Sequence, residues 1–329
     1  MKVQNETKNQ HYVSQVEQRL NTSTPNLPKK SQKIHSFKIL DRESYSIEME
    51  GSKAKSIENN LSWHDLFTFD VETKTVRNNF ESLFGEYESK IETHTIDLLK
   101  KLNENNNDIK EELLGLFILK ILNTFRNPYC IKKTLNTVGK AGMHKPLDEA
   151  LAKIFQKVAQ GNKPHQQWLC SQLGITRTEY VDWLKTLFIL LMRPEENQPN
   201  LLEQMVKSLY EADSHLINVF VFYYDGDLGE GGVLLSDRGF SIPAPSDEVL
   251  AYNFNLSSKA FITYAFSDID SIAPEGTPQN IIDAVKRMPK RVSVKIVKND
   301  FDALTTYNRH TLYQAFERVY CSSKVAYGL

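Results

Sequence analysis

The fold class turns on residues 78–102, which read NNFESLFGEYESKIETHTIDLLKKL. The apolar side chains of this segment recur mostly at three- and four-residue steps. They are Phe80, Leu83, Phe84, Tyr87, Ile91, Leu98 and Leu102. Such a period is typical of a long helix with one apolar face, because side chains three and four positions apart lie on the same side of a helix. The segment therefore predicts where a helical region begins.

The chain before this helix alternates between apolar and polar residues, as half-buried strands do. Residues 34–40 and 45–49 have this pattern on either side of a polar turn, which predicts a hairpin. Residues 65–71 predict a further strand. The N-terminal part is therefore expected to be β-rich, after a polar and basic start.

The chain after this helix first continues with helical patterns and then returns to strands. Helices are predicted at residues 109–125, 147–158, 166–173, 179–191 and 201–209. Strands are predicted at residues 216–224, 233–235, 250–256, 260–265 and 292–297, with helices at 277–288 and 304–319. The last helix is expected to close the chain.

These patterns together predict an α+β protein in which β-rich N- and C-terminal segments pack together with a long, mostly helical middle block. The expected regions are residues 1–76, 77–213 and 214–329. We expect them to form one composite domain, since a chain of 329 residues can bury one large core.

The charge balance excludes a general attraction to polyanions. Forty basic residues face 41 acidic ones, so nucleic acid or anionic membrane would have to be bound locally. The basic stretch 286–298 and the acidic stretch 225–250 are expected to be solvated faces that pair with each other. The acidic turn at residues 225–230 favours a solvated hairpin turn over a site for a hard cation.

The cysteines and the hydropathy pattern indicate the expected compartment. Cys130, Cys170 and Cys321 are odd in number and far apart, which argues against a disulfide framework or a thiolate zinc site. The longest apolar run, residues 184–192, is too short to span a bilayer. We therefore expect a cytoplasmic protein with no membrane partner.

The common catalytic motifs are absent from the sequence. It contains no P-loop, GxSxG, HExxH or dinucleotide GxGxxG, and none of its eight histidines has a spacing that predicts a metal site. Residues 169–184 resemble a helix-turn-helix, with capping-box spacing at Thr176 and Glu179. Because Glu179 and Asp182 would repel phosphates, an ordinary helical hairpin is favoured over a DNA reader.

The most distinctive local feature is the run Asn9-Gln10-His11-Tyr12-Val13-Ser14-Gln15, followed by Leu20. In this run the chain resembles the prokaryotic family catalogued as domain of unknown function 4238, whose members open with His-(His/Tyr)-x-Pro-Gln. The likeness continues in order through short further landmarks. These are residues 34–41, Leu66-Phe67, Phe80-Glu81, Glu88, Arg126-Asn127-Pro128, Leu235-Ser236-Asp237 and Asn308.

The resemblance covers most of the chain and implies a role in bacterial defence against phage, without supplying a reaction. Ser14 stands where the family usually has Pro, and Arg238-Gly239 replaces the commoner Asn-Pro. These departures indicate divergence or an altered activity.

The residues shared with the family suggest a site. His11 would act as an acid, a base or a ligand, Glu81 and Glu88 would supply carboxylates, and Arg126 would clamp an anion. Asp237 and Asn308 complete the predicted catalytic set, and the predicted binding residues are Tyr12, Gln15, Asn127 and Ser236. A divalent metal ion is the cofactor expected there.

A structural interpretation of the same residues stays open. Ser236-Asp237 would then be a turn, Arg126 would form a buried ion pair with Glu81 or Glu88, and Asn308 would cap a helix.

Two functions follow from these alternatives. One is a defence effector with hydrolase or nuclease activity on nucleic acid, since His and carboxylates can hold a metal ion that activates water. The other is a non-enzymatic sensor or binding module that recognises a phage or host protein.

Overall fold

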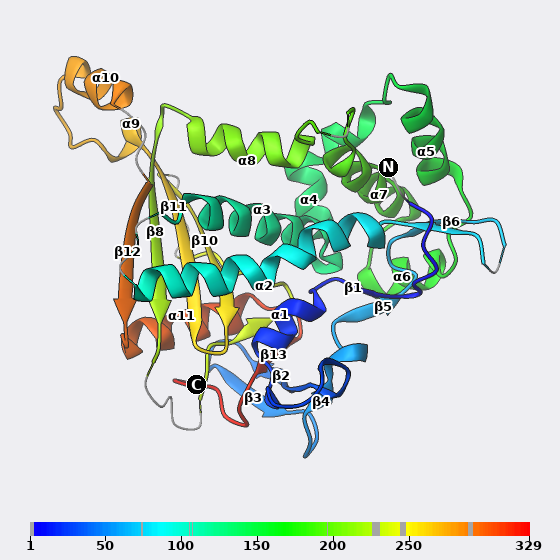
Figure 1. Cartoon of the computed structure of the whole chain (residues 1–329), viewed down its shortest axis with the longest axis horizontal. Helices are drawn as coiled ribbons and strands as arrows, with labels where there is room; N and C mark the ends of the chain where they lie inside the picture. Colours follow the sequence, from blue (N-terminus) through cyan, green and yellow to red (C-terminus); the bar gives the residue numbers. More distant parts are fainter. Residues whose placement is uncertain are drawn as a thin grey trace. The chain divides into compact units, whose positions relative to one another are not determined.

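The computed structural model describes residues 3–73, 75–104, 106, 108–195, 197–225, 231–243, 248–288 and 292–329. Helices make up 45% and strands 23% of these residues, which confirms the predicted α+β class. The chain forms two compact units, and Figure 1 labels the helices and strands along the chain. Unit 1 comprises Met1–Val16, Asn59–Ile96 and Leu113–Val206, and unit 2 comprises Glu17–Glu58, Asp97–Glu112 and Lys207–Leu329.

Unit 1 is mostly helical and carries two small antiparallel ribbons, and some of its helices have their last or first residues in unit 2. Its strands are β1 (Asn9–His11), which pairs with β5 (Ser62–His64), and β6 (Thr68–Val71), which pairs with β7 (Arg77–Asn79). Its helices are α2 (Glu81–Asn103), α3 (Lys110–Arg126), α4 (Ile131–Val138), α5 (Glu149–Gln160), α6 (Gln166–Leu173), α7 (Arg177–Leu191) and α8 (Leu201–Glu211), with the 3-10 turns Pro128–Cys130 and Gly139–Met143.

Helix α7 lies in the core of unit 1. Tyr180, Trp183 and Leu184 are fully buried, and the Trp183 indole N–H donates to the Phe125 carbonyl at 2.8 Å. The capping box predicted at Thr176 and Glu179 is present, and Gly174 turns the chain between α6 and α7 with φ of 61°. The predicted helical hairpin is therefore confirmed, and most of its second helix is inaccessible.

The prediction missed one element of the helical block. Helix α4 and the 3-10 turn after it occupy Ile131–Val138 and Gly139–Met143, where no helix was expected. Only Ile131, Thr134 and Val138 of α4 are buried, so its apolar pattern is short. A pattern of this length carries little periodic signal.

Unit 2 contains two larger sheets. One has the strand order β10 (Val249–Ser257), β11 (Ala260–Asp268), β8 (His215–Tyr223) and β12 (Val292–Lys298). The other runs β3 (Ser46–Met49), β2 (Lys33–Asp41), β13 (Arg318–Cys321) and β9 (Leu235–Ser236), and β4 (Lys55–Ser56) also pairs with β2. Its helices are α1 (Gln15–Leu20), α9 (Ile269–Ile272), α10 (Gln279–Arg287) and α11 (Phe301–Gln314), with 3-10 turns at Lys29–Ser31 and Ile57–Asn59.

The second sheet joins the two ends of the chain. Strand β13 pairs antiparallel with β2, with Val319 opposite Phe37, and with β9, with Val319 opposite Ser236. The predicted packing of N- and C-terminal β segments is thus confirmed. Because distant strands pair, each unit is assembled from separate ranges, whereas the three regions expected from the sequence are contiguous.

Two predictions at the C-terminus are wrong. Helix α11 ends at Gln314, and residues 318–321 form β13, so the closing element is a strand and not a helix to residue 319. Asn308 lies inside α11, whose N-cap is Asp300, and it therefore caps no helix end. The β-branched and aromatic residues of β13 pack on both of its neighbours in the sheet, and this pairing outweighs the helical pattern.

Some predicted features fall on residues outside the described ranges. These are residues 226–230 of the acidic turn, residues 244–247 of the acidic stretch and residues 289–291 of the basic stretch. Within the described part of that stretch, Lys286 pairs with Asp270 at 2.6 Å, which lies outside the acidic residues 225–250.

The three cysteines are free and buried. Among the described residues, no helix combines the length and the apolar composition needed to cross a bilayer.

Candidate functional site

The N-terminal motif lies at the start of unit 1. His11 is the last residue of β1 and is almost fully buried. Its Nε2 lies 3.4 Å from the side-chain nitrogen Nε2 of Gln15. The Tyr12 ring contacts Tyr129 edge-on with centroids 5.5 Å apart, and it also contacts Trp63 at 6.3 Å. The motif is therefore part of the packed interior of unit 1.

Three of the predicted catalytic residues form one group on helices α2 and α3. The Arg126 guanidinium is buried at the end of α3, and its Nη1 lies 2.6 Å from Glu88 Oε1. The guanidinium carbon Cζ of Arg126 lies 4.7 Å from the centroid of the Phe84 ring. The Glu81–Arg126–Glu88 group thus contains the buried ion pair that the structural interpretation predicted.

The carboxyl of Glu81 in this group has a strongly raised pKa. Burial raises the pKa of the Glu81 carboxyl to about 8, Arg126 opposes this rise and Glu88 adds to it. Within the described residues, Glu81 Oε1 is buried without a hydrogen-bond partner. A carboxyl with this pKa carries its proton near neutral pH and can donate it.

Ser236 and Asp237 form the predicted turn after β9 in unit 2. The Gly239 N–H donates to the Ser236 carbonyl at 3.0 Å and to its hydroxyl at 3.1 Å. The Asp237 carboxylate accepts from the N–H groups of Phe316 and Glu317 at 2.7 Å and from that of Arg318 at 2.9 Å. Burial raises the pKa of Asp237, and these three hydrogen bonds oppose the rise.

The two predicted asparagines also bind backbone groups. Asn308 accepts from the Leu234 N–H and donates to the carbonyls of Gly232 and Tyr327, each at 3.0 Å. The Asn127 side chain accepts from the Tyr129 N–H at 3.0 Å and caps the 3-10 turn that follows. Both asparagines are fully buried.

The predicted set is therefore divided. Glu81, Glu88 and Arg126 come together in unit 1, whereas Asp237 and Asn308 belong to unit 2 and hold loops and strand ends there. A catalytic role for these residues stays a prediction.

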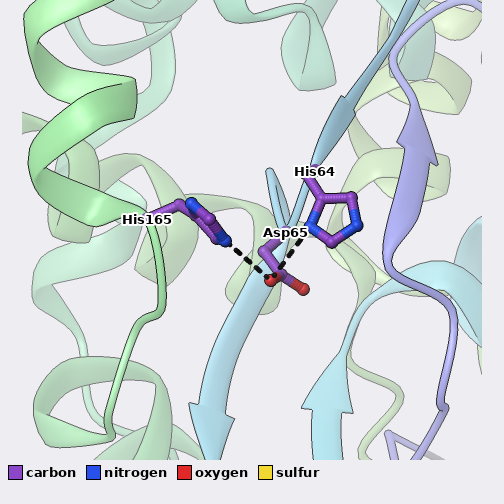
Figure 2. Close-up of side chains that lie close together, drawn as sticks. All are labelled: His64, Asp65 and His165. Atoms are coloured by element: carbon purple, nitrogen blue, oxygen red, sulfur yellow. Dashed lines mark ion pairs between the residues drawn. The ribbon is translucent and has the colours of Figure 1, made fainter.

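A different cluster in unit 1 offers three metal-ligand atoms. His64, Asp65 and His165 each present one such atom, and these atoms lie within 4.8 Å of one another. His64 Nδ1 lies 3.6 Å and His165 Nε2 3.8 Å from Asp65 Oδ2. In the view of Figure 2, His165 lies to the left and His64 to the right of this carboxylate, and the two rings meet edge-on with centroids 5.5 Å apart. We call these residues the His64–Asp65–His165 cluster.

The carboxylate of the cluster is held in place by other side chains. Asp65 follows β5, and its Oδ1 accepts from Arg77 Nη2 and, at 3.1 Å, from the Thr68 hydroxyl. Oδ2 is left facing the two imidazoles. Such outer hydrogen bonds orient the carboxylate ligands of metal sites.

The cluster is open to solvent on its histidine side only. The side chains of His64 and His165 are 55% and 49% exposed, against 3% for Asp65. Asp65 and His165 both have positive φ, 59° and 62°, a backbone conformation that non-glycine residues rarely adopt. Such outliers concentrate at functional sites.

The donor set suits a transition-metal ion. Two imidazoles and one carboxylate leave a position for water in a four-coordinate zinc site, and they also match the ligands of non-haem iron. Ligand atoms around a zinc ion lie roughly 3.3 Å apart, as metal–ligand distances of about 2.0–2.1 Å require. The His64 and His165 nitrogens lie 3.6 and 3.8 Å from Oδ2, slightly beyond that spacing.

A hollow of about 630 Å³ adjoins the cluster, because His165 is part of its wall. The hollow is lined by Lys163, His165, Gln166, Gln167, Trp168, Ser171 and Arg177, and we call it the α6 hollow. Within the described residues, the guanidinium of Arg177 makes no hydrogen bond or ion pair. The hollow therefore offers cationic, polar and aromatic surface beside the candidate metal ligands.

Sequence reasoning missed the cluster. The adjacent pair His64-Asp65 is a weak signal, and His165 lies about a hundred positions away, so no spacing rule joins them.

In comparisons with known proteins, no family model, no curated protein sequence and no solved structure matches this chain. The resemblance to the family of domain of unknown function 4238 thus stays a prediction.

Proposed function

We propose that the chain is a metal-dependent hydrolase that acts on nucleic acid, and that it serves bacteria as a defence effector against phage. The observation that supports this proposal is the His64–Asp65–His165 cluster beside the α6 hollow. A divalent ion bound there would supply an activated water for hydrolysis. The cationic hollow supports a phosphate-bearing substrate, since Lys163 and Arg177 line it.

Different residues of the chain would bind the metal ion, orient its carboxylate ligand and bind the substrate phosphate. Asp65 and the two imidazoles would hold the ion, and Arg77 and Thr68 would keep Oδ2 directed toward it. Arg177 would bind a phosphate oxygen. Its guanidinium is suited to this role because its donors form a planar fork and make no hydrogen bond with any described residue.

A binding module remains the second candidate. It is favoured by Asp237 and Asn308, whose polar atoms bind backbone groups. If the residues shared with the family only shape the fold, the family resemblance implies recognition without a reaction.

The test is hydrolysis of fluorescently labelled DNA and RNA, single-stranded and duplex, by the purified chain with Mg²⁺, Mn²⁺ or Zn²⁺ added. The double variant His64→Ala/His165→Ala should lose activity by at least about 100-fold, because two of three ligands are gone. His144→Ala is the matched control, since His144 is also exposed and belongs to unit 1 but lies outside the cluster. Equal cleavage by wild type and double variant would refute the proposed site.

Phage plating on bacteria that express the same three proteins tests the biological role. Protection by the wild type and by His144→Ala, and not by the double variant, is the expected result. Protection by all three would favour the binding module.

A further inference from the structure

Resting on the proposed function, we infer that the α6 hollow binds an unpaired segment of nucleic acid, with a base stacked on Trp168 and phosphates held by Arg177 and Lys163. The surface chemistry of the hollow and the burial of helix α7 support this mode of binding.

The aromatic part of the hollow is the exposed indole of Trp168, which other aromatic rings hold in position. Trp168 is 49% exposed, and its ring packs edge-on against Trp63 with centroids 5.6 Å apart. Trp63 in turn contacts Tyr129 at 5.9 Å and Tyr12 at 6.3 Å. This aromatic row holds Trp168 in place while leaving part of its ring open. Unpaired bases stack on such platforms without sequence preference.

The cationic wall lies on the same short hairpin. Arg177 is the first residue of α7, and Lys163 lies three positions before α6. Lys163 is tied to the Gly161 carbonyl at 3.0 Å, which leaves further ammonium protons to donate. Two cations and one aromatic ring in the same lining match the phosphates and bases of a strand.

Polar groups between these walls add donors. Gln166, Gln167 and Ser171 line the hollow, and His165 precedes α6 without a side-chain cap for the helix N-terminus. Uncapped N–H groups at a helix start favour anions. The hollow thus combines hydrogen-bond donors for phosphates with an aromatic ring on which a base can stack. Its volume of about 630 Å³ lies within the usual size range of small-molecule sites.

Duplex recognition by the same hairpin is disfavoured. A helix-turn-helix protein inserts its second helix into the major groove, which requires an exposed face along that helix. In α7, Tyr180, Trp183 and Leu184 are fully buried, and only the start of the helix reaches the hollow. Bases of a duplex are also paired and stacked on each other, so Trp168 could not stack on them.

The experiment measures binding by fluorescence anisotropy in excess EDTA, so that no cleavage occurs. The labelled ligands are a 12-nucleotide oligo-dT, a 12-nucleotide oligo-rU and a blunt duplex of two annealed strands. Single strands should bind at least about 10-fold more tightly than the duplex. Trp168→Ala should weaken single-strand binding by about 5- to 150-fold, whereas Trp168→Phe should retain most of it. Arg177→Gln should weaken binding and reduce the salt dependence by about one phosphate contact.

Lys153→Gln is the matched control for charge, because Lys153 is 72% exposed in unit 1 and lies outside the hollow. It should bind like the wild type. The inference is overturned if duplex and single strand bind equally, if Trp168→Ala binds normally, or if unlabelled thymidine monophosphate competes as effectively as the oligonucleotide. The last result would identify a free nucleotide as the occupant.

The two proposals fail separately. Strand binding that depends on Trp168, with no metal-dependent cleavage, would refute the hydrolase and keep the inference. Metal-dependent cleavage that persists in Trp168→Ala and Arg177→Gln, with unchanged affinity, would keep the hydrolase and refute the inference.

Discussion

Asp65 in unit 1 and Asp237 in unit 2 are both buried carboxylates, yet their oxygens have different neighbours. Both oxygens of Asp237 accept backbone N–H groups, from residues 316–318. Among the described residues, hydrogen bonds from Arg77 and Thr68 reach Oδ1 of Asp65, whereas Oδ2 faces two exposed imidazoles. Burial alone therefore does not distinguish a candidate metal ligand from a structural carboxylate, whereas the neighbours of each carboxylate oxygen do.

The hollows near the two carboxylates differ in the same way. A hollow of about 320 Å³ in unit 2 is lined in part by Arg42 and Arg318. Arg42 donates to the carbonyls of Tyr313, Ala315 and Phe316, and Arg318 pairs with Glu50 at 3.0 Å. The cations there serve the fold, while Arg177 of the α6 hollow makes no such contact within the described residues.

The largest expected effect comes from removing Asp237. Asp237→Ala would leave three backbone N–H groups without their acceptor and should lower the free energy of unfolding by about 3–5 kcal/mol. Urea denaturation measures this loss. Asp302→Ala, an exposed change on α11, should cost less than about 1 kcal/mol. A loss no greater than that control would show that Asp237 does not hold residues 316–318.

Metal binding distinguishes the two carboxylates directly. With Zn²⁺ at about 100 times its Kd, the wild type should gain about 2.7 kcal/mol of stability. The double variant His64→Ala/His165→Ala should gain nothing measurable, and Asp237→Ala should keep the Zn²⁺ affinity of the wild type. Calorimetric titration and denaturation with and without Zn²⁺ give both quantities. Equal stabilisation of the double variant would contradict the cluster as a metal site.

A third carboxyl, that of the partly buried Glu81, extends the comparison to the pH dependence of stability. Its pKa is about 8 in the folded chain against an ordinary 4.5, so the folded chain keeps a proton that the unfolded chain loses between these values. The stabilising contribution is therefore complete below pH 4.5 and is lost as pH rises through 8. The slope should reach about 1.4 kcal/mol per pH unit.

Urea denaturation of Glu81→Gln across pH 4.5–8 should show a free energy of unfolding that lacks this fall with pH. Glu86→Gln is the control, because Glu86 is exposed on the same helix. An unchanged pH dependence in Glu81→Gln would mean that Glu81 is already ionised in the fold.

The smallest effect is expected at the hairpin that carries the α6 hollow. The Thr176 hydroxyl accepts from the Glu179 N–H at 3.1 Å, which does at an exposed helix end what Asp237 does in the interior. Thr176→Ala should cost about 1 kcal/mol. Thr178→Ala, one residue into the first turn, should change stability by less than about 0.5 kcal/mol. Equal effects of the two changes would argue against the capping box.

Local sequence patterns predicted much of this fold. The helix at residues 166–173, the glycine turn and the capping box were all predicted correctly, since each depends on residues within a few positions. The ion pair of Arg126 with Glu88 was one predicted alternative. The cap assigned to Asn308 was wrong, because Asp300 starts α11 and Asn308 bonds to distant backbone instead.

What the sequence determined by itself was therefore the class of the fold and the type of most elements, because helical and strand periods repeat over a few residues. Only the tertiary structure decided that His165 meets His64 and Asp65, and that Asp237 binds residues 316–318. Such contacts depend on how distant segments pack, and the residues that make them carry no local pattern that reveals their partners.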